Sequence, residues 1–425
     1  MTARTRTNRP VVTGLGIVAP TGLDAGAYWA ATTHGRSGIA RITRFDPSAY
    51  TATVAGQTDL DAASRVPNRL LPQTDPMTRL ALVAAEEALA DAEVDPRALP
   101  AFSAGVFTAA SAGGFDFGQR ELEALWSKGG EYVSAYQSFA WFYPVNTGQI
   151  SIRHQLRGPG GAVVADQAGG LDAVAKASRT VQNGTPLMVT GGVDGSLCPW
   201  AWICLIASGR VSREDRPELA YLPFDAAASG HVPGEGGAIL IVEDPVAAAD
   251  RGARAYGEIS GHASTFDGKA GPGGDGLRRA ILGALDQAEA RPGEIDVVFA
   301  DAAGVPELDA VESAVLAEIF GRRAVPVTAP KSMVGRLLAG AGPLDLAAAL
   351  LSLRDGVIPP TVNVTQPAYA HAIDLVREAP RAADLASALV VARGHGGFNS
   401  AMVLHAVGGG PERTASDSPN GRDYR

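Results

Sequence analysis

The sequence predicts an α/β fold in which two similar halves each layer helices on a β-sheet. Strand-like apolar runs alternate with helix-length amphipathic runs along most of the chain, as such layers require. A local repeat indicates that one half duplicates the other. Ala168-Gly-Gly-Leu-Asp172 opens a predicted helix that ends at Gly184, and Ala341-Gly-Pro-Leu-Asp345 opens one that ends at Gly356. Chance similarity in a chain rich in alanine and glycine is the alternative explanation.

Apolar periodicity places the individual elements. Strands are predicted at 10–18, 105–109, 162–165, 186–190, 238–242, 296–299 and 388–392, and helices at 77–92, 169–183, 275–290 and 308–320. The first strand contains Gly14 and Gly16, but neither a third glycine nor a suitably placed acidic residue follows. This pattern favours a tight turn at the end of the strand over a dinucleotide-binding loop.

Length and composition bound the domain organisation. With 425 residues, 46% of them hydrophobic, the chain can bury a large core as two or three domains or as one duplicated unit. We expect a flexible N-terminus at 1–9, an N-terminal half at 10–250, a C-terminal half at 251–407 and a disordered tail at 408–425. The tail is dominated by Gly, Pro, Ser, Asp and Arg, which cannot supply a core.

Charge, cysteines and histidines exclude several classes of function. The net charge of −9 argues against nucleic acid and anionic membranes as partners. No apolar run approaches the roughly 20 residues of a membrane span, and no secretory signal precedes the first strand. Cys198 and Cys204 lack the spacing of a metal or redox pair, so we interpret both as buried small hydrophobic residues in a reducing compartment. We therefore expect a cytoplasmic protein without a metal site.

A strand, a sharp turn and a helix start follow one another in Val163-Val-Ala-Asp-Gln-Ala-Gly-Gly170. Such an elbow presents its turn residue at a helix N-terminus, where backbone N–H groups favour negative charge. Enzymes place a cysteine or serine nucleophile at this point. Here the residue is Gln167, whose amide neither titrates nor attacks an acyl group. The sequence therefore predicts that no acyl-enzyme forms on it.

Five collinear stretches resemble the β-ketoacyl synthases, and the resemblance extends from residue 10 to about residue 405. They are the elbow at 163–170, Pro223-Phe-Asp225 with the glycine-rich run at 234–243, the segment 300–312, Lys331-Ser-Met-Val-Gly-Arg336, and Gly394-His-Gly-Gly-Phe-Asn399. The resemblance implies a thiolase-like fold of two βαβ-layered halves, in the layer order αβαβα. It also implies a place in a carbon–carbon condensing complex of the acyltransferase class.

The residues that perform the chemistry in that family are replaced in this chain. The resemblance places Gln167 at the position of the catalytic cysteine, Asp301 at that of the first histidine and Arg336 at that of the second. The glycine-rich loop carries His395 where the family has phenylalanine. Lys331 keeps the residue that supports the family's active-site network. No catalytic set is intact, so we expect no independent condensing activity.

This pattern of replacement resembles the chain-length factors, the ketosynthase β subunits of bacterial type II aromatic polyketide synthases. The stretches 139–143, 146–153 and 165–170 carry the closer resemblance. It implies a heterodimer with a catalytic ketosynthase α subunit and a growing poly-β-ketone in a tunnel between the subunits, whose length this chain sets. An acyl carrier protein would dock mainly on the partner, and its phosphopantetheine arm would enter the partner, leaving this chain without a cofactor.

Two other functions are compatible with the same replacements. Glutamine at this elbow also occurs in loading ketosynthases that decarboxylate malonyl groups, so malonyl-acyl-carrier-protein decarboxylation for priming is one alternative. A purely structural pseudoenzyme is the other. Decarboxylation needs donors that stabilise an enolate, and an anionic Asp301 would repel it.

The replaced residues also have an expected structural role. We expect Asp301 to pair with Arg336 and to hold two loops together. Lys331 would neutralise Asp301 or Glu312. The amide of Gln167 would satisfy buried backbone groups.

A helix predicted after Gly114 carries the candidate chain-length residues. Phe115, Gly118 and Leu122 are spaced i, i+3 and i+7, which places them on one helix face. From spacing alone an ordinary amphipathic core helix is the alternative, whereas the resemblance implies a helix that lines the tunnel. Because Gly118 and Leu122 are smaller than aromatic residues, we expect a relatively long cavity and a correspondingly long product.

Aromatic residues elsewhere extend the expected interface. The resemblance makes Phe139 a further wall residue of the tunnel. The apolar run 139–143 suggests a strand covered on both faces, as at a subunit contact. Trp200 and Trp202 are compatible with either the core or the interface.

Overall fold

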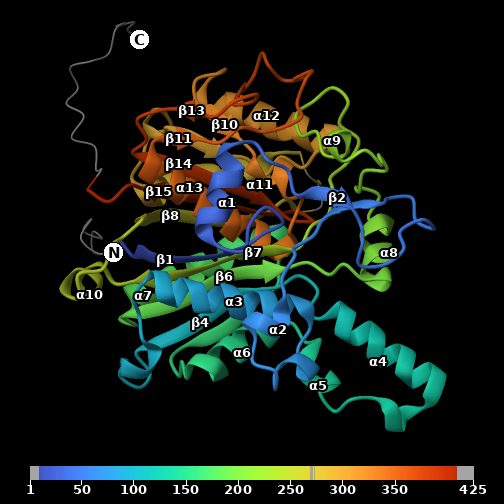
Figure 1. The fold of residues 1–425 in the computed structure, drawn as a ribbon. Helices are drawn as coiled ribbons and strands as arrows, with labels where there is room; N and C mark the ends of the chain where they lie inside the picture. Colours follow the sequence, from blue (N-terminus) through green and yellow to red (C-terminus); the bar gives the residue numbers. More distant parts are fainter. Residues whose placement is uncertain (1–8, 269–270, 272, 409–425) are drawn as a thin grey trace, which may run out of the picture.

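The computed structural model describes residues 9–268, 271 and 273–408. Apart from residues 9 and 408, the termini predicted at 1–9 and 408–425 lie outside these ranges. The described chain folds around a mixed sheet of 11 strands in the order β12-β10-β9-β14-β15-β8-β1-β7-β6-β4-β5, with helices packed over it (Figure 1). The predicted α/β class is confirmed.

The large sheet contains one strand pattern twice. The first half supplies β1 (Val11–Val18), β4 (Ala104–Ala109), β5 (Gly160–Val163), β6 (Leu187–Asp194) and β7 (Gly236–Glu243). The second half supplies β8 (Gly257–Phe266), β9 (Val297–Phe299), β10 (Pro326–Thr328), β14 (Ser387–Arg393) and β15 (Phe398–His405). Taken in chain order, the strands of each half lie side by side as third, second, fourth, fifth and first.

Strand directions repeat as well. β4 is parallel to β5 and β6, while β6 and β1 are both antiparallel to β7. In the same way, β9 is parallel to β10 and β14, while β14 and β8 are both antiparallel to β15. The topology thus contains the duplication that the local repeat indicated. The boundary predicted after residue 250 falls at the end of α10 (Pro245–Asp250), between β7 and β8.

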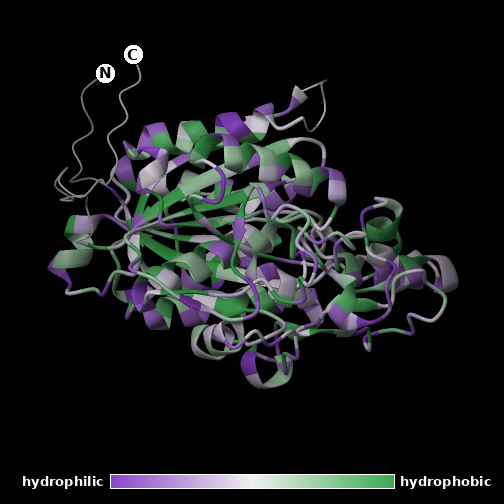
Figure 2. Cartoon of the chain, turned by 90° about the horizontal axis from the view of Figure 1, so that it is seen from above, coloured by the Kyte–Doolittle hydropathy of each residue, from purple (hydrophilic) through white to green (hydrophobic). Residues whose placement is uncertain are grey.

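Five layers result from this duplication. Helices α7 (Asp166–Gln182) and α13 (Ala341–Asp355) lie between the two halves of the sheet. Helix α3 (Pro76–Asp91) covers the outer face of the first half, and α11 (Asp275–Ala288) and α12 (Pro306–Phe320) lie on the side of the second. Figure 2 shows the hydrophobic strands in the middle and helices with mixed faces outside them. This is the αβαβα order of a thiolase-like fold.

The two inner helices touch at the repeated motif itself. A Cβ atom on Gly170 would lie 2.3 Å from Pro343 Cδ, and one on Gly342 would lie 3.0 Å from Leu171 Cγ. A side chain at position 170 would therefore prevent this approach, and one at position 342 would force Leu171 to shift. The repeat that reveals the duplication in the sequence also forms the contact between the two related helices.

Glycines in the first strand correct one sequence prediction. Gly14 and Gly16 do not form a turn but lie inside β1, where added Cβ atoms would come within 2.2 Å of Ala88 O and 1.8 Å of Ala84 O in α3. Both face the helix because residues two apart share one face of a strand. Gly261 of β8 makes the equivalent approach, 2.1 Å, to a carbonyl oxygen of α11. Glycine is thus used for close strand–helix packing in both halves.

Shorter elements complete the chain. They are α1 (Ala25–Thr33), β2 (Ile39–Arg41), β3 (Val54–Gly56), α2 (Ala62–Arg65), α4 (Phe115–Lys128), α5 (Gln137–Ala140), α6 (Val145–His154), α8 (Pro199–Ala207), α9 (Pro217–Ala220), β11 (Val357–Ile358), β12 (Asp374–Leu375) and β13 (Arg381–Ala382). Helix α4 projects from the body at the lower right of Figure 1. Among the described residues, no helix combines the length and apolarity needed to cross a membrane.

The close packing of β1 on α3 is testable. Substituting Gly16→Val should lower the free energy of unfolding by roughly 3 kcal/mol or more, since strand and helix must separate to admit the side chain. Gly293→Val is the matched control, because a Cβ there meets nothing within 4 Å. Melting temperatures of the two variants compare the sites directly. Equal stability of both would contradict the packing role of Gly16.

Candidate functional site

The elbow predicted at 163–170 is present. β5 ends at Val163, and α7 begins at Asp166, whose φ of +48° turns the chain sharply into the helix. Gln167 lies in the first helical turn and is only 2% exposed. Asp166 Oδ2 accepts a hydrogen bond of 2.6 Å from the His395 backbone N–H. The elbow is therefore tied to the glycine-rich loop at 394–397.

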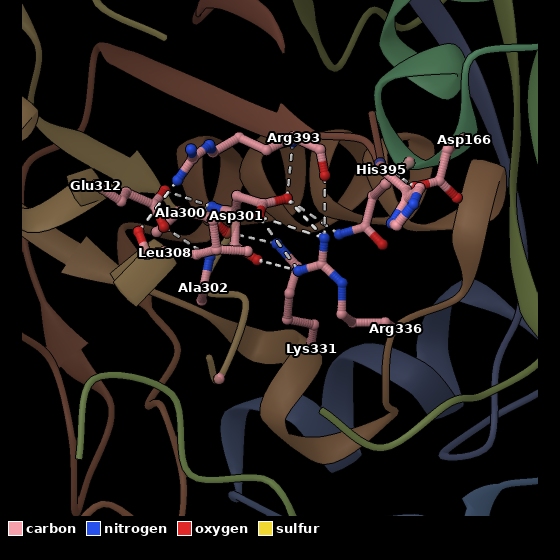
Figure 3. A network of polar contacts seen from close by, with 12 residues as sticks. Asp166, Ala300, Asp301, Ala302, Leu308, Glu312, Lys331, Arg336, Arg393 and His395 are labelled. Carbon is pink, nitrogen blue, oxygen red and sulfur yellow. Dashed lines mark hydrogen bonds and ion pairs between the residues drawn. The ribbon is translucent and has the colours of Figure 1, made fainter. Parts of the chain in front are cut away.

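The three replaced residues meet in one buried network, whose ionic part Figure 3 shows. Arg336 Nη2 lies 3.2 Å from Asp301 Oδ1 and Nη1 lies 3.2 Å from Oδ2, so the guanidinium faces the carboxylate fork to fork. Gln167 Nε2 donates to Asp301 Oδ1 at 3.1 Å. The ion pair expected between the two loops is thus formed. The expected contact of Gln167 with buried backbone groups is replaced by a hydrogen bond to that pair.

Neighbouring groups keep this pair ionised. Burial alone would raise the pKa of Asp301, but the charges of Arg336, Lys331 and Arg393 outweigh it and lower that pKa. Glu312 accepts hydrogen bonds from the backbone N–H groups of Asp301 and Ala302 at 2.7 and 2.9 Å. Burial, together with the charge on Asp301, raises the pKa of Glu312. The surroundings therefore favour the ionised form of Asp301 and disfavour that of Glu312.

Lys331 corrects a prediction. It was expected to neutralise Asp301 or Glu312, but its Nζ lies 2.7 Å from Asp345 Oδ2 and donates to the Ala300 carbonyl. Asp345 is the acidic residue of the repeated motif and lies buried in α13. Because α13 occupies the middle layer, this carboxylate needs a buried counter-charge, which Lys331 supplies. Lys331 affects Asp301 only through space, by lowering its pKa.

A cavity of about 610 Å³ lies beside this network. Gln167, Arg336 and His395 line it together with His231 and Cys204. Burial and the charge of Arg336 lower the pKa of His231 to about 3, so this imidazole is neutral at physiological pH. The cysteine prediction was half right, because Cys198 is buried and Cys204 is exposed.

Phe115, Gly118 and Leu122 lie on helix α4 and form what we call the gate face, after the tunnel role that the sequence resemblance predicts for them. Trp200 of α8 lies against this face: its ring centroid is 4.5 Å from that of Phe115, and its Cζ3 is 3.4 Å from the Cβ position of Gly118. Leu122 and Trp200 also share an open groove of about 680 Å³. The buried side chain of α4 is Phe117, whereas Phe115 and Leu122 are only partly buried. This distribution does not match an ordinary core helix centred on the gate face.

The aromatic run at 139–143 is not a strand, contrary to prediction. Residues 137–140 form α5, and a bend and a turn follow. Phe139 is 38% exposed and makes an edge-to-face contact with Tyr136, with ring centroids 5.6 Å apart. The run failed as a strand because an unbroken aromatic sequence marks an apolar surface without fixing the backbone. Phe139 is not among the residues that line the groove of about 680 Å³.

Three residues were missed or left open by the sequence predictions. Trp202 is fully buried in the core, whereas Trp200 is 37% exposed and faces α4. Asp345 was quoted only as part of the repeat. Its counterpart Asp172 contacts His262 Nε2 at 3.3 Å, so both repeated aspartates hold a basic side chain. The repetition of an acidic residue at a helical position in the core was the available signal.

Comparisons with known proteins agree with this geometry. Residues 8–247 match the β-ketoacyl synthase N-terminal domain, and residues 256–365 match the C-terminal domain. The actinorhodin polyketide putative β-ketoacyl synthase 2 of Streptomyces coelicolor is 57% identical over 397 residues, which cover 93% of this chain and 98% of that protein. The chain belongs to the β-ketoacyl synthase family.

Its branch of that family is the ketosynthase β subunits, or chain-length factors. The tetracenomycin polyketide synthase ketoacyl synthase β subunit of Streptomyces glaucescens is 57% identical over 402 residues, covering 94% of this chain and 98% of the relative. The solved ishigamide ketosynthase/chain length factor superposes with a TM-score of 0.86 at 27% identity, covering 94% of this chain and 99% of that one. The thiolase-like fold is confirmed.

The contribution of the Asp301–Arg336 ion pair to stability can be tested by removing one partner. Arg336→Met should destabilise the protein by about 3–5 kcal/mol, because the Asp301 carboxylate is left buried without its counter-charge. Arg291→Met removes an exposed guanidinium that pairs with Glu294 and should leave the unfolding midpoint nearly unchanged. Urea unfolding measures both. A midpoint for Arg336→Met that equals the wild-type value would show that the pair does not stabilise the fold.

Proposed function

We propose that this protein is the non-condensing subunit of a two-subunit polyketide ketosynthase and that it sets the length of the polyketide chain. It pairs with a catalytically intact ketosynthase subunit in the cytoplasm. The acyl carrier protein delivers substrate mainly to that partner, whose active site receives the phosphopantetheine arm. The growing poly-β-ketone extends along the gate face of α4, at the contact between the subunits.

The network around Gln167 is the observation that carries the non-condensing role. Condensation requires a nucleophile, a base and free donors for an oxyanion. Gln167 supplies no nucleophile, and its Nε2 already donates to Asp301. Arg336 also donates to the carbonyl oxygens of Asp301 and Arg393 at 3.0 and 3.1 Å, so its donors face protein acceptors. Gln167 and Arg336 are therefore hydrogen-bonded to the protein itself.

A large apolar surface supports the partnership. Exposed aromatic and aliphatic side chains gather on α4, on the segment 132–143, on α6 and beside β5; they include Trp126, Tyr132, Phe142, Ile152 and Val164. Several exposed apolar side chains on consecutive elements of one chain are typical of a protein–protein contact. β5 is also an edge strand of the large sheet. An edge strand exposes unpaired backbone groups that a second chain can cover.

Malonyl decarboxylation is less well supported by the same geometry. The enolate it produces would have to lie beside the ionised Asp301 carboxylate, and the nearby imidazole of His231 is held neutral. A purely structural role differs from the proposal in one respect. It leaves product length independent of the gate face.

The non-condensing role predicts that the purified chain is not acylated by malonyl or acyl carrier proteins. Intact-mass spectrometry of the chain should show no adduct. Gln167→Cys alone should also remain unacylated, because Asp301 and Arg336 supply neither the base nor the free donors that a thiol needs. The intact ketosynthase partner, treated in the same way, is the positive control. A covalent acyl adduct on this chain would contradict the proposal.

The gate face predicts product length. Gly118→Phe or Leu122→Phe should shift the products of the reconstituted complex toward shorter chains, and Phe115→Ala should allow longer ones. A ring added at Gly118 must fill the space beside Trp200, whose Cζ3 is 3.4 Å from the Cβ position. Overpacking costs about 1–3 kcal/mol, roughly a ten- to hundredfold bias at each extension step.

Product masses measure the effect. The free room expected beside Gly118 is occupied by the Trp200 ring, so the small size of Gly118 does not by itself lengthen the cavity. Unchanged lengths from all three variants in normally assembled complexes would favour the structural alternative.

A further inference from the structure

Helix α4 begins on a buried carboxylate that it shares with another helix. Asp75 is 1% exposed. Its Oδ1 accepts the Met77 N–H at 2.9 Å and so caps α3, while its Oδ2 accepts the Phe117 N–H at 2.9 Å in the first turn of α4. One side chain therefore fixes the start of a core helix and the start of the projecting helix relative to each other.

The backbone at the start of α4 packs too closely on its neighbours to leave room for a side chain. Gly114, the residue before α4, would place a Cβ 2.8 Å from Asp75 Cβ and 2.4 Å from the Ala140 carbonyl oxygen. Gly113 adopts a φ of +81° and would place its Cβ 2.0 Å from the Trp141 carbonyl oxygen. The start of α4 is thus held between Asp75 on one side and the backbone at 140–141 on the other.

The rest of α4 is less buried than its start. Of its residues, only Phe117 and Gly118 are buried. Further along, Gln119 Oε1 accepts the Trp200 N–H at 2.9 Å and Glu121 Oε2 accepts the Ser134 N–H at 2.6 Å. Ser134 belongs to the same projecting segment, so that bond moves with the helix. The direction of α4 is therefore set by the contacts of its first turn with Asp75 and by the bond between Gln119 and Trp200.

A second carboxylate holds the other end of the loop that connects β4 to α4. Asp194, at the end of β6, accepts the Ser111 N–H at 2.6 Å, the Gly195 N–H at 2.9 Å and the Ala339 N–H at 3.2 Å. Burial raises the pKa of Asp75 and of Asp194 to about 6, although the backbone hydrogen bonds oppose it. Both groups are ionised above that pH, and their backbone donors compensate part of the cost of burying the charges.

We propose that Asp75 is a positioning residue for chain length, which holds the gate face at a fixed distance from Trp200 through its hydrogen bond to Phe117. The proposal rests on the function proposed above for α4. Leu122 lies five residues beyond Phe117, about 7.5 Å along the axis at the usual helical rise. A tilt at the first turn therefore moves Leu122 against Trp200 and changes the width of the groove between them.

The experiment separates the two bonds of Asp75 with Asp75→Ser. Serine is as good a helix N-cap as aspartate, so α3 stays capped, but its single hydroxyl cannot also reach Phe117. The reconstituted heterodimer should assemble and turn over malonyl groups at the wild-type rate. The fraction of products of the wrong length should rise roughly fivefold, the factor that one net hydrogen bond contributes to an equilibrium.

Asp296→Ser is the matched control. Its Oδ2 accepts the Ala386 and Ser387 N–H groups at 2.8 and 3.0 Å in the other half of the molecule, and its loss should leave product lengths unchanged. Leu122→Phe tests the function of α4 in the same assay. If Leu122→Phe shifts the products and Asp75→Ser does not, the positioning role is wrong and the function of α4 stands. If neither shifts them, both proposals fail.

A second variant tests the proposal if Asp75→Ser fails to assemble. Asp75→Asn is then measured instead, because its side chain keeps the size of aspartate but has only one oxygen to accept from the two backbone N–H groups. A broadened length distribution at unchanged total output supports the positioning role, which a merely structural cap would not produce. A wild-type distribution from the assembled Asn variant overturns it.

Discussion

Burying the Asp301 carboxylate constrains every residue around it, because an interior anion needs a counter-charge and donors for its lone pairs. Arg336 supplies the charge, and Gln167 and the Arg393 N–H supply further donors at 3.1 and 2.8 Å. These groups come from the start of α7, the loop before α13 and the end of β14. One carboxylate thus joins the first half of the molecule to the second at the place where a condensing relative keeps its reactive groups.

The same constraint limits the donors that the site could offer to a substrate. A condensing enzyme must leave donors and a base free for substrate, whereas here the donors of Gln167 and Arg336 are bonded to protein acceptors. Lys331, which could otherwise approach Asp301, is held by Asp345. The cavity of about 610 Å³ beside the network is lined by Gln167 and Arg336, whose Nε2 and Nη atoms already donate to protein acceptors.

The fold class, and the grouping of Gln167, Asp301 and Arg336, were accessible from sequence because they depend on local signals. Apolar runs predicted β1, β4, β5, β6, β7, β9 and β14, but not the central strands β8 and β15. Collinear motifs pointed to Gln167, Asp301 and Arg336, which the structure brings together. Pairings that depend on three-dimensional neighbours were not accessible. Lys331 has several acidic candidates within the chain, and only the fold brings Asp345 to it. Likewise, no local sequence signal distinguishes a glycine that turns the chain from Gly16, whose lack of a side chain lets helix α3 pack closely on the strand.

One burial prediction failed for a related reason. Cys204 was expected to be buried, yet it is exposed in this chain. Phe139 and Phe142, which were expected to be covered at a subunit contact, are exposed in the single chain. Hydrophobic residues report that a surface is to be covered, but they do not say by which chain. We therefore expect a second subunit to cover the exposed aromatic residues of the segment 132–143.

The projection of α4 bears on how such proteins diversify. Because Phe117 and Gly118 are the buried residues of this helix, the outer turns contribute little to the folding of the core. Substitutions on exposed helix faces usually change stability by less than about 0.5 kcal/mol. Under the role proposed for α4, selection can act on product size through this helix while the duplicated scaffold and its ion pair stay intact. Under that role, a lineage needs few changes on the helix to reach a new product without first acquiring a more stable protein.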